Sequence, residues 1–476
     1  LARSRGLGDV YKRQILFSFN SVLQAKTISV TSPDDDGYGT FRYAINKASE
    51  SKKPVTIKVK TNKTIIIGNS LDYTGLQPLT IIGSGQVVRG NNVDILKISN
   101  GADLSISDLS FFGIGSFNIK RKGTGYGMYN VDAKAGKGIF VDVRDDQTGT
   151  ININLKNVRV EGVANHGIHI SDCNLADKCG SGSGGAGEGS SASINVVLDN
   201  VTIFDAGNGK FDADGFRVDE RGDGDINFTA LNSKFLYVGA DGVELDEGQK
   251  GNVVANVTNS IFSNNGAYCD PKLLKAYMPA EDEGEFEDNQ RAKNSIPSKI
   301  KGSPDDGCFE REVELYPSGF VKEFEFGIDL DDGFDIDEAG QGNLVVNIDR
   351  SRIVGNLDEG LDFDEENNGD MFLQIKNTVA MNNTDDGIKN SENDGGSIIA
   401  LFEGINSIDN GGKGIVVEEE DTGNVQGFVQ STFTRGNDDG DKTGIEAVQE
   451  DDGMGTLKIV SSTIVEGFDL EGVELK

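Results

Sequence analysis

A short motif recurs along this chain and constrains its fold more than any other feature. The motif reads glycine, apolar, any residue, apolar and then two acidic residues. Its glycines are Gly138, Gly167, Gly215, Gly242, Gly333, Gly360, Gly387, Gly414, Gly444 and Gly472. From Gly333 to Gly414 the interval is 27 residues each time, and it is 27 again from Gly215 to Gly242. A fixed period in this range predicts a solenoid, in which each repeat is one structural unit stacked on the next.

Each repeat contains three short apolar stretches separated by turn residues, for example LVVNID, RIV and GLDFDE. Apolar and polar residues alternate within them, which predicts strands with one face inward and one outward. Three strands in 27 residues make one turn of a parallel β-helix. We expect the last strand of each repeat to point these residues inward: Phe334, Leu361, Ile388 and Ile415, followed by Ile336, Phe363, Asn390 and Val417.

Two other columns of the repeat have structural interpretations. The motif glycine is expected to be a corner residue, in a backbone conformation that β-branched residues cannot adopt. An asparagine column begins the middle strand, and stacked asparagines can hydrogen-bond along the axis. This column comprises Asn157, Asn200, Asn232, Asn259 and Asn377.

Near the start of the chain, GTFRYAINKASE places Phe41, Ala44, Ile45 and Ala48 on one face of a predicted helix. The repeat, the asparagine column and this helix together resemble the right-handed parallel β-helix (pectin-lyase-like) superfamily, from about Thr27 onward. The resemblance implies an all-β solenoid with an N-terminal capping helix, as a single domain over 26–476. It does not imply one activity, because the superfamily contains lyases, hydrolases, epimerases, adhesins and phage tailspikes.

The ends of the chain and its insertions are interpreted separately. Residues 1–14 look like a translated sequencing adaptor, and 15–25 resemble the remnant of a signal peptide, with a buried strand as the alternative. Loop insertions are expected at about 173–192 and 266–320. The sequence stops at GVELK within a repeat, so we expect a truncated C-terminus. Local disulfides Cys173–Cys179 and Cys269–Cys308 are favoured among three possible pairings, which fits an oxidising compartment.

The charge of the chain limits its partners. With 45 Lys and Arg against 78 Asp and Glu, the formal net charge is −33. Nucleic acid and anionic membranes are disfavoured, because both need clustered basic residues. Apart from 15–25, no run approaches the ~18 apolar residues needed to span a membrane. The balance favours cations, or anionic ligands bridged by a cation.

The acidic residues fall into two columns that we expect to face outward. The pairs after the glycine are Asp219 with Glu220, Asp246 with Glu247, Asp337 with Glu338, and Asp364 with Glu365. The column before the glycine is Asp214, Asp241, Asp332, Glu359 and Asp386. Like charges one strand apart repel by ~1 kcal/mol in water and ~3 kcal/mol at an effective dielectric near 20. These columns predict Ca²⁺ ligands, which are hard oxygens in variable number; a solvated face screened by salt is the alternative.

Both histidines lie in NHGIHISDC, with His166 before the glycine and His169 in the outward column. If the insertion after them loops out, Arg217 lies beside His169 on the next turn, with Glu244 beyond it. We predict His166, His169 and Arg217 as a catalytic cluster for acid–base chemistry, against the alternative that they are ordinary surface positions. The resemblance implies a mechanism in which calcium binds a uronate carboxylate and a basic residue takes the adjacent proton. The WxDH, NTD…DD…GHG…RIK and FDPH patterns of known β-helix enzymes are absent.

Two functions therefore remain open. One is a secreted, monomeric, calcium-binding β-helix that engages extracellular polysaccharide or cell-surface glycan, as a lyase-like enzyme. The other is a non-catalytic surface or matrix β-helix, an adhesin or stalk, with a cation-stabilised acidic face.

Overall fold

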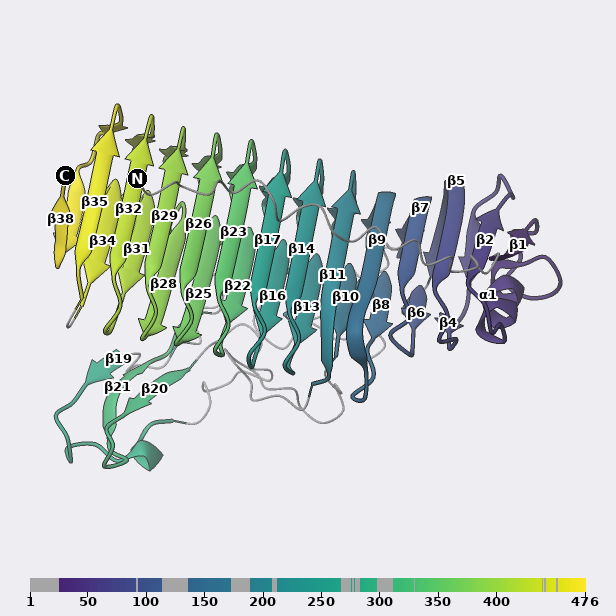
Figure 1. The fold of residues 1–476 in the computed structure, drawn as a ribbon, viewed down its shortest axis with the longest axis horizontal. Coiled ribbons are helices and arrows are strands. Elements are labelled where there is room, and N and C mark those ends of the chain that lie inside the picture. The colour runs from purple at the N-terminus through teal and green to yellow at the C-terminus, as the bar shows by residue number, and fades with distance from the viewer. Residues whose placement is uncertain are drawn as a thin grey trace, which may run out of the picture.

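The computed structural model describes residues 25–90, 93–113, 136–172, 189–207, 212–266, 275, 278, 283–297, 311–328, 330–438, 440, 442–450 and 453–476. The chain forms a right-handed parallel β-helix whose turns stack along one long axis (Figure 1). This confirms the fold expected from the 27-residue period. The expected N-terminal segments and all four cysteines lie outside the described residues. Among those described, no helix is both long enough and apolar enough to cross a bilayer.

Each turn contributes one strand to a 12-stranded parallel sheet, whose strands follow chain order along the axis. They are β4 (Leu71–Tyr73), β6 (Leu96–Ile98), β8 (Ile139–Asp142), β10 (Ile168–Ser171), β13 (Phe216–Glu220), β16 (Val243–Glu247), β22 (Phe334–Glu338), β25 (Leu361–Asn367), β28 (Lys389–Asp394), β31 (Ile415–Glu419), β34 (Ile445–Gln449) and β37 (Phe468–Glu471). Pairing is in register with the motif, as between Phe334 and Leu361.

The remaining helix strands belong to a 23-stranded sheet that covers the other sides of each turn. They are β1 (Lys26–Val30), β2 (Val55–Val59), β3 (Ile65–Ile67), β5 (Leu79–Gly90), β7 (Leu104–Phe112), β9 (Thr148–Glu161), β11 (Ser191–Asp199), β12 (Thr202–Phe204), β14 (Ile226–Leu231), β15 (Lys234–Leu236), β17 (Val253–Thr258), β18 (Ile261–Ser263), β23 (Leu344–Asp349), β24 (Arg352–Val354), β26 (Met371–Lys376), β27 (Val379–Met381), β29 (Ile398–Glu403), β30 (Asn406–Ile408), β32 (Val425–Gln430), β33 (Phe433–Arg435), β35 (Gly455–Val460), β36 (Thr463–Ile464) and β38 (Val473–Leu475).

The core runs inside the coil, and a helix covers its first turn. The predicted inward residues of the last strand, from Phe334 to Val417, are all buried. Aromatic rings stack between turns: the Phe262 ring centroid lies 5.4 Å from that of Phe334, with the ring planes 2° apart. Helix α1 (Phe41–Ser49) buries the four predicted residues, and its N-terminus is capped by the Thr40 hydroxyl, which accepts from the Tyr43 amide. The helix therefore shields apolar surface that the first turn would otherwise expose.

The motif glycine is required for a different reason from the one expected. Of the motif glycines only Gly472 has a positive φ, at 64°. The others lack room, since a Cβ on Gly333 would lie 2.4 Å from the Gly360 carbonyl oxygen, and one on Gly360 would lie 2.4 Å from that of Gly387. The glycines thus allow successive turns to stack closely, and the expectation of an unusual backbone conformation is wrong for these positions.

Two asparagine ladders follow the axis. The predicted column sits at tight corners with positive φ, and Asn200 Nδ2 donates to Asn157 Oδ1 at 2.8 Å. A second, buried ladder was not predicted. In it Asn356 Nδ2 donates to Asn383 Oδ1 at 3.0 Å, and Asn383 Nδ2 donates to Asn410 Oδ1 at 3.1 Å. Both ladders satisfy amide groups from one turn to the next, which fixes the register of the stack.

The second insertion contains structure of its own. Between β18 and β22 the chain forms a three-stranded antiparallel sheet of β19 (Glu283–Glu285), β20 (Glu312–Leu315) and β21 (Val321–Glu325), with a 3₁₀ turn, η2 (Lys293–Ser295). This sheet stands beside the β-helix (Figure 1). The coil continues undisturbed across it, because β17 pairs with β23 residue for residue, from Val253 with Leu344 to Thr258 with Asp349.

Candidate functional site

The outward face of the 12-stranded sheet carries two of the three predicted catalytic residues, His169 and Arg217. One column of register partners runs through Phe140, His169, Arg217, Glu244, Asp335, Asp362 and Lys389. The structure therefore confirms that Arg217 lies beside His169 on the next turn, with Glu244 beyond it. Neighbouring strands are about 4.8 Å apart, so these side chains are direct neighbours along the axis.

His169 is the centre of a buried hydrogen-bonded chain. The Lys137 ammonium contacts its Nδ1, and its Nε2 lies 2.5 Å from Asp219 Oδ2. Burial lowers the pKa of His169 well below its usual value, and the charge of Lys137 lowers it further, against the opposing effect of Asp219. The imidazole is therefore neutral at pH 7, and it accepts from Lys137 while donating to Asp219. Its side chain is only 2% exposed.

His166 contacts the same cluster through its ring. The ring centroids of His166 and His169 are 4.6 Å apart, and His166 Nδ1 accepts from the Asp214 backbone amide at 2.9 Å. The structure thus brings the three predicted catalytic residues together. Their catalytic role remains a prediction.

Arg217 is surrounded by carboxylates. Its guanidinium lies 2.7 Å from Asp219, 2.8 Å from Asp246 and 3.3 Å from Asp214, and it also contacts Glu244. Burial alone would raise the pKa of Asp219, but Arg217 and His169 hold it well below its usual value. Arg217 therefore neutralises the carboxylates of two adjacent turns in this part of the sheet, and its donors are directed at protein carboxylates.

The acidic pairs after the glycine do not all face outward. Their aspartates form the expected outer column, with Asp246 paired to Asp337 and Asp337 to Asp364. The expectation that their glutamates also project outward is wrong. Those glutamates are Glu220, Glu247, Glu338 and Glu365, continued by Glu392 and Glu419, and all are 0% exposed. Strand alternation places them on the opposite face from the aspartates, inside the coil.

These interior glutamates close the turn that follows each strand. Oε1 of Glu365 accepts from the Gly369 amide at 2.9 Å, and Oε1 of Glu392 accepts from the Gly396 amide at 2.7 Å. Burial raises the pKa of Glu247 to about 9, with a further contribution from Glu338, and burial raises that of Glu392 to about 7. Oε2 of Glu220, Glu338, Glu365 and Glu392 has no hydrogen-bond partner among the described residues, and the charges of neighbouring carboxyl groups raise the pKa values of Glu247 and Glu365 beyond the effect of burial.

The column before the glycine is buried as well, and it contacts the next turn. Asp214 Oδ1 accepts from the Asp241 amide at 3.2 Å, and Asp241 accepts from the Asp332 amide in the same way. Asp386 likewise accepts from the Lys413 amide. These carboxylates therefore have a structural role in addition to any ligand role.

Three groups of carboxylates among the described residues place one oxygen each within 4.8 Å of the others. They are Asp212, Asp214 and Glu244; Asp332, Glu359 and Asp362; and Asp358, Glu359 and Asp385. The first group contacts Arg217, which neutralises part of its charge. None of the three contains the interior glutamates, so the pairing of outer aspartate and glutamate as joint ligands is not what the structure assembles.

The group of Asp332, Glu359 and Asp362 has the features of a cation site. Asp332 and Asp362 are 7% and 9% exposed, and Oδ1 of each has no hydrogen-bond partner. Burial raises the pKa of Asp332 well above its usual value, and the carboxylates of Glu359 and Asp362 raise it further. Buried carboxylate oxygens without donors are costly, and a divalent cation would satisfy them with the hard oxygen ligands that Ca²⁺ prefers.

Some members of this site were missed in the sequence. Asp332 and Glu359 were predicted as ligands, whereas Asp362 and Lys389 were not, and Lys137 was not predicted beside His169. The signal was present in the repeat, because Asp362 and Lys389 occupy the same position after the glycine as His169 and Arg217.

Comparisons with known proteins give a likeness of fold. No protein-family model and no curated protein matches this chain. Among solved structures it is similar to the A-module of mannuronan C-5 epimerase AlgE6 from Azotobacter vinelandii, at 10% identity and a TM-score of 0.38, over 94% of this chain and 99% of that chain. The AlgE4 A-module from the same organism is 11% identical with a TM-score of 0.36, over 94% of this chain and 94% of that chain. The periplasmic alginate epimerase AlgG is 10% identical with a TM-score of 0.33, over 94% of this chain and 85% of that chain. Similarities of this size do not transfer a function.

Proposed function

We propose that this protein is a secreted or cell-surface Ca²⁺-binding β-helix that engages an anionic polysaccharide through its acidic face. The observation that carries the proposal is the pair of buried, unpartnered Oδ1 atoms of Asp332 and Asp362, beside Glu359. Lys389 supplies the cluster with a single positive charge, at 3.0 Å from Asp362 Oδ2. Three carboxylates against one ammonium leave an excess negative charge that a divalent cation would neutralise.

Calcium fits this group better than magnesium. Ca²⁺ accepts six to eight oxygens in tolerant geometry, whereas Mg²⁺ demands a near-ideal octahedron. Carboxylates on successive strands are set by the sheet spacing and cannot all rearrange around a small ion. A Ca²⁺ held by three protein carboxylates retains free coordination positions, which uronate carboxylates can fill. This is how an acidic face could bind an acidic polymer without repulsion.

The test is thermal unfolding in EDTA and across titrations of CaCl₂ and MgCl₂. We expect calcium to raise the midpoint with concentration, equivalent to about 2.7 kcal/mol at 100 times the Kd. Asp332→Asn and Asp362→Asn should abolish the calcium-specific rise. The control is Glu403→Gln, which removes a surface carboxylate on another sheet. An equal rise with both metals, or with any salt, would identify a merely screened acidic face.

A second candidate is the lyase-like enzyme, favoured by the chain from Lys137 through His169 to Asp219. His169 is neutral and held in one tautomer, but Nδ1 already accepts from Lys137 and Nε2 donates to Asp219, so it could take a substrate proton only after Lys137 moves away from Nδ1. Its burial argues for the non-catalytic alternative, an adhesin or stalk. We would incubate polyuronates with Ca²⁺ and measure the absorbance of unsaturated products. Product formed by the wild type and lost in His169→Gln, with the melting midpoint preserved, supports the enzyme; equal turnover in both removes His169 from catalysis.

A further inference from the structure

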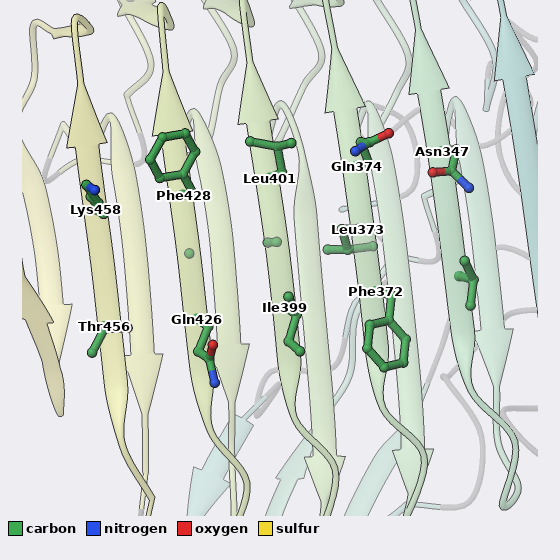
Figure 2. A pocket seen from close by; sticks show the side chains of 13 residues that line it. Asn347, Phe372, Leu373, Gln374, Ile399, Leu401, Gln426, Phe428, Thr456 and Lys458 are labelled. Atoms are coloured by element: carbon green, nitrogen blue, oxygen red, sulfur yellow. The ribbon is translucent and has the colours of Figure 1, made fainter. Parts of the chain in front are cut away.

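The outward face of the 23-stranded sheet carries a groove with exposed apolar side chains. It has a volume of about 640 Å³ and crosses β23, β26, β29, β32 and β35 (Figure 2). Phe372 and Ile399 are 37% and 43% exposed, and Phe428 lies two strands from Phe372. Exposed apolar side chains that form one contiguous patch often mark an interaction surface, whereas those scattered singly do not.

The groove is free of carboxylates in a chain with 78 Asp and Glu. Its lining contains one charged residue, Lys458, whose Nζ lies 5.6 Å from the centroid of the Phe428 ring. On β26 and on β32, one glutamine and one phenylalanine of the lining lie two residues apart. Gln374 and Gln426 are exposed and make no side-chain hydrogen bond to any other described residue. The groove therefore offers ring faces and unused hydrogen-bonding groups side by side (Figure 2).

Strand register orders these groups into two short rows. One row is Phe372, Ile399 and Gln426, and the other is Gln374, Leu401 and Phe428. The two phenylalanines are two strands apart along the axis, about 9.6 Å, and two residues apart along the strand, about 6.6 Å, so their backbones are separated by roughly 12 Å. Because each row is held by the sheet, the surface is organised before a ligand arrives.

We infer that this groove binds an uncharged polysaccharide chain, independently of the acidic face. The apolar ring faces of the sugars would pack on Phe372 and Phe428, and their hydroxyls would hydrogen-bond with Gln374 and Gln426. A purely apolar partner would bury these amides without hydrogen-bond partners, which is unfavourable. An anionic chain is disfavoured here because the net charge of the protein is −33 and the groove offers one positive charge, Lys458, to offset it. The same repulsion disfavours a second copy of this chain.

The experiment is affinity electrophoresis in EDTA through gels that contain a neutral polysaccharide: mixed-linkage β-glucan, xyloglucan, glucomannan or dextran. Polygalacturonate gels form the anionic arm. We expect retardation by at least one neutral polymer, and a loss of affinity of tenfold or more in the double variant Phe372→Ala/Phe428→Ala. The matched control is Ile82→Ala, which removes a similarly exposed apolar side chain from β5 of the same sheet. Unchanged melting midpoints establish that the variants are folded.

Three results would overturn the inference. The first is no retardation of the wild type by any neutral polymer, and the second is equal retardation of the wild type and the double variant. The third is a wild-type dimer in sedimentation that the double variant dissociates, which would make a second copy the occupant. Asp332→Asn removes a proposed calcium ligand and should bind neutral polymers as the wild type does. Failure of the calcium proposal can therefore be told apart from failure of the groove proposal.

Discussion

Lys389 and Asp362 lie on adjacent turns, with the lysine Nζ 3.0 Å from one carboxylate oxygen, Oδ2, while the other, Oδ1, has no partner. The same ammonium is 3.7 Å from Glu359 Oε1. One cation is therefore shared by two carboxylates, and the third member of the group, Asp332, is left without one among the described residues. This imbalance makes the stability of the site depend on what else neutralises it.

Removal of that ammonium should expose the imbalance. Lys389→Met keeps the length of the side chain and deletes its charge, so we expect a loss of roughly 3 kcal/mol in EDTA because buried carboxylates lose their partner. Added Ca²⁺ should restore much of it. Urea unfolding in EDTA and in CaCl₂ measures both effects. Lys376→Met, which breaks a surface pair with Glu403, is the matched control and should cost less than about 1 kcal/mol. Equal losses in the two variants would contradict the interpretation.

The interior glutamates should make the protein less stable as the pH rises. Their folded pKa values are raised, to about 7 for Glu392 and about 9 for Glu247, from an ordinary value of 4.5. For each glutamate, between pH 4.5 and its raised pKa, the unfolded chain binds fewer protons than the folded one, so the free energy of unfolding falls as the pH rises. We expect the contribution of Glu392 to be lost between about pH 4.5 and 7. Urea unfolding in EDTA at pH 5, 7 and 9 measures the slope.

A substitution separates this effect from the outer carboxylates. Glu392→Gln retains an oxygen that can accept from the Gly396 amide but cannot titrate. Its stability should therefore decline less steeply than that of the wild type between pH 5 and 7. A wild type whose stability increases over that range would show that the interior stack does not control the pH response.

The motif glycine should be intolerant of even one methyl group. In Gly360→Ala the added Cβ would lie 2.4 Å from the Gly387 carbonyl oxygen and 2.5 Å from Asn383 Nδ2. Two turns would have to separate, at a cost of about 2–3 kcal/mol. Gly68→Ala is the control, because its Cβ would meet only Asp35 Oδ2, at 3.5 Å. Thermal midpoints should fall for the first variant alone; a matching fall for both would implicate backbone flexibility in place of turn spacing.

The buried asparagine ladder should contribute more to stability than a pair of asparagines on the outer face of the coil. Asn383→Ala breaks the amide bonds to Asn356 and Asn410 and leaves buried partners unsatisfied, so we expect a loss of about 1–3 kcal/mol in urea unfolding. Asn195→Ala removes a similar bond, to Asn152 at 2.9 Å, on the outer face of the coil. Solvent can replace that bond, and the expected change is within about 0.5 kcal/mol.

The fold was predictable because its information is periodic. The 27-residue interval fixes which residues become register partners, and this is why Arg217 could be placed beside His169 across an insertion. The same information gave the inward column from Phe334 onward. Strand alternation should also have placed Glu338 opposite Asp337, but the density of acidic residues suggested one charged face. Burial of a carboxylate depends on partners, here backbone amides and other carboxyl groups, and sequence does not display these.

The site was predictable only in part. Asp332 and Glu359 were expected as ligands, whereas their partner Asp362 and the neighbouring Lys389 lie further along the column of His169, Arg217 and Glu244, where no ligand was predicted. The groove at Phe372 was not predicted, because the sequence does not distinguish an exposed phenylalanine in a strand from a buried one. The role of the motif glycine was also missed, because a lack of space between turns cannot be seen in one turn alone.

The register that survives the antiparallel insertion has a consequence for how such a chain can change. Asn252 and Asn343 are 91 residues apart, yet their side chains are bonded at 3.0 Å as neighbours. At a period of 27, this leaves 91 − 27 = 64 residues added without a shift in the stack. Insertions can therefore be added between strands while the stacked turns keep their spacing. Adding a turn at the end of the coil, or an insertion between two strands, leaves the distances between the existing sites unchanged.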